Sequence, residues 1–105
     1  MRPTEAHRRH GEIQLLDVRE SKEWVAGHID GAVHLPMSQL AARQDELATD
    51  RVIVAVCRSG ARSGHVAHAL QRAGYQAENM DGGMQAWAAA GLPFVSEDGH
   101  DPRVA

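Results

Sequence analysis

Apolar residues fall along this chain in short runs, some with the spacing of buried strands and others with the spacing of helices. The longest continuous run is Val52 to Val56, and five consecutive apolar residues favour a strand that is covered on both faces, as in a parallel sheet. We therefore expect this strand to be central. Three further strands are predicted at Ile13 to Val18, Ala32 to Leu35 and Tyr75 to Met80.

Helical spacing separates these candidate strands. Apolar residues recur at helical intervals from Val66 to Ala73, and Gly74 supplies the expected C-terminal cap. Shorter helices are predicted at Thr4 to His10, at Lys22 to Ala26 with Ser21 as N-cap, from Ser38 to Leu47, and at Met84 to Ala90. This alternation predicts an α/β fold, a three-layer sandwich in which helices flank a mainly parallel central sheet of four to five strands.

Length, composition and charge narrow the class of protein. A chain of 105 residues with 43% apolar residues can bury one modest core, so residues 1–95 are predicted to form a single domain and the polar tail 96–105 to be disordered. The net charge of −3 is spread without a basic stripe, which argues against nucleic acid as a partner. No apolar run approaches the roughly 20 residues that span a bilayer, and no signal peptide is evident. We expect a cytoplasmic monomer that does not bind membranes.

The only cysteine, Cys57, follows the predicted central strand and precedes a glycine-containing loop that opens a helix. Ligands bind at this end of the strands in open α/β sheets. Loop N–H groups, the helix N-terminus, Arg58 and Arg62 would all favour a thiolate, and Ser59 and Ser63 can donate hydroxyl hydrogen bonds. Free cysteine is often an inert buried residue, but two arginines, two serines and two glycines within the next seven residues suit a bound anion better than a packed core.

Three stretches of the chain have a recognisable order and spacing. They are LLDVRESKEWVAGHIDGAVHLP, then VCRSGARS, then GY followed by MDGGMQAWAAAGLP. Together they resemble the rhodanese family, and the resemblance extends from about Glu12 to Phe94. It implies an α/β fold in which Cys57 is the catalytic, sulfur-accepting nucleophile, and neither a cofactor nor a metal is needed. With the serines of the loop included, the expected substrate-binding residues are Arg58, Ser59, Gly60, Ala61, Arg62 and Ser63.

The resemblance also implies a reaction. In this family, thiosulfate or another sulfane donor converts the cysteine to a persulfide, and the outer sulfur passes to cyanide in assays or to a thiol in cells. The chain is therefore predicted to be a thiosulfate sulfurtransferase. Its expected partners are a small-molecule sulfur donor and a thiol acceptor, for which a thioredoxin-like protein is one candidate.

Two alternatives stay open. Cysteine-dependent phosphatases and arsenate reductases also place a cysteine and an arginine in an anion-binding loop, but phosphatases of this kind have five residues between the two. Cys57 and Arg62 have four, which leaves a smaller cradle that suits sulfur better than phosphate. The second alternative is a sulfur-relay or interaction module, although interaction modules of this family commonly lack the cysteine.

For other residues of these three stretches we predict structural rather than catalytic roles. Asp17 and Arg19 are expected to form a salt bridge or to anchor a loop, and His28 to hydrogen-bond the backbone. Gly82 and Gly83 fit a tight turn between a strand and a helix. The seven histidines include two pairs at helical spacing, but neither pair has a third or fourth ligand, so no metal site is expected.

Overall fold

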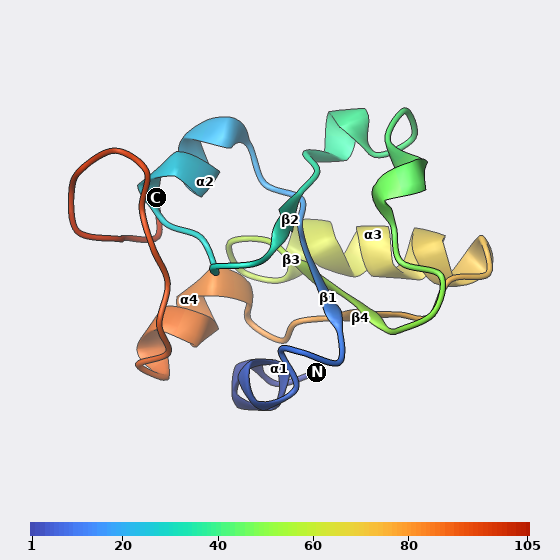
Figure 1. Ribbon diagram of the computed structural model, residues 1–105, viewed down its shortest axis with the longest axis horizontal. Coiled ribbons are helices and arrows are strands. Elements are labelled where there is room, and N and C mark those ends of the chain that lie inside the picture. Colours follow the sequence, from blue (N-terminus) through green and yellow to red (C-terminus); the bar gives the residue numbers. More distant parts are fainter.

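The computed structural model describes residues 1–105 and contains one sheet of four parallel strands in the order β2-β1-β3-β4 (Figure 1). The strands are β1 (Gln14–Asp17), β2 (Val33–His34), β3 (Ile53–Val56) and β4 (Ala77–Asn79). As predicted, β3 is internal to the sheet, and every residue in it is buried. The chain therefore has the expected α/β architecture, with four strands.

Alternate side chains of β3 enter two separate apolar clusters, one on each face of the sheet. Ile53 and Ala55 pack with residues of α3 (Ala61–Arg72), whereas Val54 and Val56 pack around Trp87 of α4 (Gly83–Ala89). Successive side chains of a strand point to opposite faces, so a strand between two helical layers needs an unbroken apolar run. This explains the composition of the central strand.

Helices form the two outer layers (Figure 1). α1 (Pro3–Arg8) packs beside α4 on one face, and α3 covers the other. α2 (Ser21–Ala26) follows the carboxyl end of β1 and contacts the first turn of α3 through side chains. None of the helices combines the length and the apolarity that crossing a bilayer requires.

Two helix ends show how local sequence positions these elements. Gly74 has φ +96° and follows α3, where the N–H of Tyr75 donates to Leu70 and that of Gly74 to Gln71, each at 3.0 Å. This is a Schellman cap, as the glycine predicted. At the start of α2 the predicted N-cap is displaced by one residue, because Glu20 forms a reciprocal capping box and Ser21 is already helical.

The predicted helix from Ser38 to Leu47 is wrong. This segment instead forms two short 3₁₀-helices, η1 (Met37–Gln39) and η2 (Gln44–Glu46). Residues three and four positions after Leu40 are arginine and glutamine, so no apolar stripe runs along one face of a continuous helix. Leu40 and Leu47 reach the same apolar cluster from separate turns.

The tail 96–105 also differs from the expected disordered segment, because it packs against α2. The N–H of Glu97 donates to Val25 at 2.9 Å, and that of Arg103 donates to Ala26 at 3.0 Å. A side chain at Gly27 would lie 2.4 Å from the carbonyl oxygen of Arg103, so the absence of a side chain there permits this approach. Val104 covers part of the cluster around Trp87. The polar composition of the tail predicted disorder because composition gives no information about such tertiary contacts.

Candidate active site

Cys57 lies directly after the central strand β3, at the start of the loop that leads into α3. Its side chain faces the interior, and the residue is only 1% exposed. The loop turns back sharply at Gly60, which has φ +105°, a left-handed conformation that other residues rarely adopt. The fold thus places the thiol at the carboxyl end of the sheet, inside the turn that begins α3.

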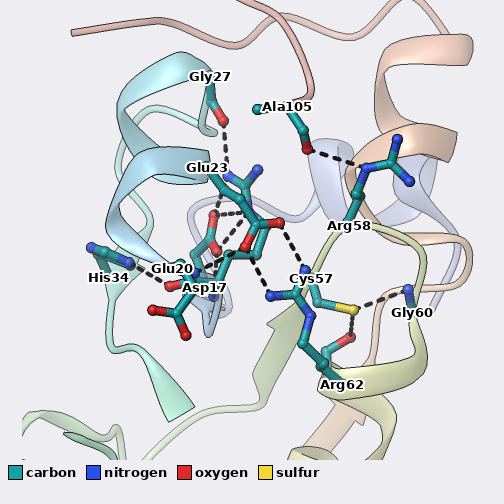
Figure 2. Close-up of polar contacts among 12 residues, drawn as sticks. Asp17, Glu20, Glu23, Gly27, His34, Cys57, Arg58, Gly60, Arg62 and Ala105 are labelled. Carbon is teal, nitrogen blue, oxygen red and sulfur yellow. Dashed lines mark hydrogen bonds and ion pairs between the residues drawn. The ribbon is translucent and has the colours of Figure 1, made fainter. Parts of the chain in front are cut away.

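Two donors reach the sulfur from within this turn (Figure 2). The N–H of Gly60 donates to Cys57 Sγ at 3.0 Å, and Ser63 Oγ lies 3.2 Å from the same atom. The single hydroxyl hydrogen of Ser63 can be donated either to Cys57 Sγ or to Asn79 Oδ1, which lies 2.6 Å from Ser63 Oγ, while Asn79 Nδ2 donates to the carbonyl of Gly60 at 3.0 Å. Asn79 on β4 therefore ties the loop to the serine that faces the thiol, a role that sequence reasoning missed.

These hydrogen bonds shift the pKa of the thiol. Burial acts to raise the pKa of Cys57, but the Ser63 hydroxyl and the backbone N–H groups of Ser63, Gly60 and Ser59 outweigh it. The net effect is a pKa below that of an ordinary cysteine, because these donors stabilise the thiolate more than the thiol. The lowered pKa agrees with the expectation from sequence. Hydrogen bonds, rather than the two arginine charges, are its main cause.

Arg62 does not present a free guanidinium to the site. It forms a two-pronged ion pair with Glu23 of α2, in which Nη1–Oε1 and Nη2–Oε2 are both 2.8 Å (Figure 2). Hydrogen bonding to Arg62 lowers the pKa of the Glu23 carboxyl, and the same contact raises the pKa of Arg62. Glu23 was not predicted as a site residue, and its only local signal is the capping-box spacing from Glu20.

Arg58 occupies a different environment from Arg62. Its side chain is exposed, and its Nε donates to the backbone oxygen of Ala105 at 3.1 Å (Figure 2). Ser59 is exposed as well, and it contributes only its backbone N–H to the environment of the thiol. Of the six loop residues predicted to bind substrate, Gly60 and Ser63 contact the sulfur directly, while Ala61 begins α3.

The N-terminus of α4 supports the loop from the opposite side. The N–H of Met84 donates to the Cys57 carbonyl at 2.8 Å, and that of Gln85 donates to the Arg58 carbonyl at 2.9 Å. A Cβ at Gly83, where φ is +60°, would lie 2.4 Å from the Cys57 carbonyl oxygen. The tight turn predicted at Gly82 and Gly83 therefore also brings the backbone close to the loop that begins at Cys57.

The structural interpretations of Asp17, Arg19 and His28 are confirmed. Arg19 Nη2 lies 2.7 Å from Asp17 Oδ2, both side chains are buried, and the same nitrogen donates to the Gly27 carbonyl at 2.8 Å. Arg19 Nη1 has no hydrogen-bond partner. His28 Nδ1 lies 2.8 Å from the Trp24 carbonyl oxygen.

Comparison with known proteins places the chain in a family. The family model for the rhodanese-like domain matches residues 3–90. The chain belongs to the rhodanese family. A rhodanese-related protein from Thermoplasma volcanium has a similar solved structure, with a TM-score of 0.86, 27% identity, and coverage of 90% of this chain and 95% of that one.

Two curated relatives show the range of proteins that contain this rhodanese-like domain. A sulfurtransferase from Allochromatium vinosum is 40% identical over 89 residues, which cover 84% of this chain and 83% of the relative. The HTH-type transcriptional regulator Rv0324 from Mycobacterium tuberculosis is 42% identical over 88 residues, which cover 82% of this chain but only 39% of the regulator. The rhodanese-like domain therefore occurs both nearly alone and as part of a longer protein.

We predict that Ser63→Ala raises the pKa of the Cys57 thiol, because it removes the hydroxyl donor that faces the sulfur. Less thiolate is then present at neutral pH, and the rate of alkylation by iodoacetamide should fall roughly threefold to tenfold. The pH profile of alkylation measures the shift directly. Ser59→Ala is the matched control because that hydroxyl makes no contact with the sulfur, and equal profiles for the two variants would contradict the assignment.

Proposed function

We propose that this rhodanese-like domain is a sulfurtransferase in which Cys57 carries sulfur as a persulfide. The main support for this role is the environment of Cys57 Sγ. This atom accepts a hydrogen bond of 3.0 Å from the Gly60 N–H and lies 3.2 Å from the Ser63 hydroxyl. Donors that stabilise a thiolate can stabilise a persulfide anion at the same place. Sulfurtransferase activity in a relative that aligns over most of both chains is consistent with this role.

The proposed reaction has two displacements. The Cys57 thiolate attacks the outer sulfur of thiosulfate, the S–S bond breaks, and sulfite leaves with the bonding electron pair. Cyanide or a thiolate then attacks the outer sulfur of the persulfide, so that thiocyanate or a new persulfide forms and the Cys57 thiolate returns. Splitting one transfer into two steps is the usual advantage of a covalent intermediate. No cofactor enters either step.

The backbone of the loop is held in the orientation that this chemistry requires. The C=O and N–H of one planar trans peptide point in opposite directions. Because Gln85 holds the Arg58 carbonyl on the α4 side, the Ser59 N–H of that peptide turns toward the thiol, and it contributes to lowering the pKa of Cys57. We infer that α4 preorganises the cradle before a donor arrives.

The donor in this proposal is a small sulfane compound such as thiosulfate, and the acceptor is a thiol, with a thioredoxin-like protein as one candidate. The test is mass spectrometry of the intact protein before and after incubation with thiosulfate. One added sulfur atom on Cys57, lost again on treatment with cyanide, is the expected result. An unmodified Cys57 would contradict the proposal, and efficient hydrolysis of an aryl phosphate by the same protein would favour a phosphatase instead.

A further inference from the structure

The two arginines of the loop differ in the charges around them. Arg62 is paired with the Glu23 carboxylate through two hydrogen bonds of 2.8 Å. Arg58 makes no ion pair with an acidic side chain, and its Nε donates to the backbone oxygen of Ala105 at 3.1 Å. Of the two arginines that the sequence placed at the site, Arg62 is therefore neutralised by an acidic side chain, and Arg58 is not.

Glu23 is held beside Arg62 by its own helix. Its side chain is only 10% exposed, and its Oε1 accepts a hydrogen bond of 3.0 Å from the N–H of Glu20 in the capping box. The neighbouring buried pair of Asp17 and Arg19 is neutral as a unit and adds no net charge. A donor that uses Arg62 must therefore approach a carboxylate that cannot easily move away.

We propose that Glu23 determines which sulfur donors the site accepts, by favouring donors with a single negative charge over dianionic thiosulfate. This inference rests on the proposed sulfur transfer at Cys57. The repulsion between a carboxylate and a dianion is about twice that between the carboxylate and a monoanion at the same distance. Glu23 is thus a specificity-determining residue, and low-charge sulfane donors such as organic persulfides or thiosulfonates are the preferred class.

The charge selectivity proposed for Glu23 can be tested with two sulfur donors that have the same reacting S–S bond but different charges. Thiosulfate carries two negative charges, and methanethiosulfonate carries one. In both reactions the Cys57 thiolate bonds to the outer sulfur, the S–S bond breaks, and sulfite or methanesulfinate leaves with the electron pair. The measured quantity is the ratio of kcat/KM for thiosulfate to kcat/KM for methanethiosulfonate. Changes in the reactivity of Cys57 itself cancel in this ratio.

Glu23→Gln removes the charge but keeps an oxygen that can accept from Arg62 and from the N–H of Glu20. The ratio should rise roughly threefold to tenfold, and the rise should shrink with added salt because Arg62 is partly exposed. Glu20→Gln is the matched control, since it removes a carboxylate from the exposed start of the same helix and should leave the ratio within about twofold of wild type.

The possible results distinguish a failure of the selectivity role of Glu23 from a failure of sulfur transfer at Cys57. An unchanged ratio in folded Glu23→Gln, with both donors still adding sulfur to Cys57, would overturn the selectivity role and leave sulfur transfer intact. Failure of both donors to load wild-type Cys57 would overturn the proposed function itself. If Glu23→Gln does not fold, Arg62→Gln is measured instead, at alkaline pH. This variant leaves the Glu23 carboxylate without its cationic partner, so kcat/KM for thiosulfate should fall relative to kcat/KM for methanethiosulfonate. A ratio that does not fall would likewise contradict the inference.

Discussion

Replacement of Cys57 with serine is expected to abolish sulfur transfer from thiosulfate to cyanide and to leave the fold intact. Cys57 is the only thiol in the chain, and a serine hydroxyl is neither ionised at neutral pH nor able to form a persulfide. Loss of a covalent nucleophile typically lowers kcat by more than about a thousandfold. The Gly60 N–H and Ser63 remain as partners for the new hydroxyl, so the free energy of unfolding should change by only about 1 kcal/mol.

Thiocyanate formation measures this prediction, and circular dichroism during thermal unfolding checks the fold. Ser59→Ala serves as the control because it alters a hydroxyl in the same loop that makes no hydrogen bond to the sulfur. A folded Cys57→Ser protein that kept even about a tenth of wild-type turnover would show that the sulfur is carried elsewhere.

Asp17→Asn is expected to lower the free energy of unfolding by about 3–5 kcal/mol, the usual cost of removing one partner from a buried ion pair. The variant would leave the fully buried Arg19 guanidinium without its ion-pair partner, and its Nη1 already has no hydrogen-bond partner. A domain of this size is typically stable by about 5–15 kcal/mol, so the loss would remove a large share of its stability.

Urea unfolding followed by circular dichroism measures the effect of Asp17→Asn. Glu46→Gln is a suitable control, because it breaks the exposed ion pair with Arg43 and should change the unfolding midpoint very little. If both variants unfolded at the same urea concentration, the Arg19 charge would have to be compensated by groups other than Asp17.

Features that depend on residues close together in the chain could be predicted from the amino-acid pattern. The run from Val52 to Val56 predicted the central strand, because both faces of such a strand must be apolar. Gly74 predicted the end of α3, because its left-handed backbone closes the helix cap locally. The position of Cys57 after the central strand placed it in the loop where the structure brings hydrogen-bond donors to its sulfur.

The charges and hydrogen-bond donors that face one another across that loop could not be predicted in this way, because folding brings them together from distant parts of the chain. Glu23 and Arg62 are 39 positions apart, and Asn79 reaches Ser63 from β4. Coulombic and hydrogen-bond energies depend on distance in space, which the spacing of residues along the chain does not reveal. For the same reason, the sequence predicted that loop N–H groups, the helix N-terminus and two arginines would together lower the pKa of Cys57, whereas in the fold hydrogen bonds are the main cause and one of those arginines is paired with a buried carboxylate.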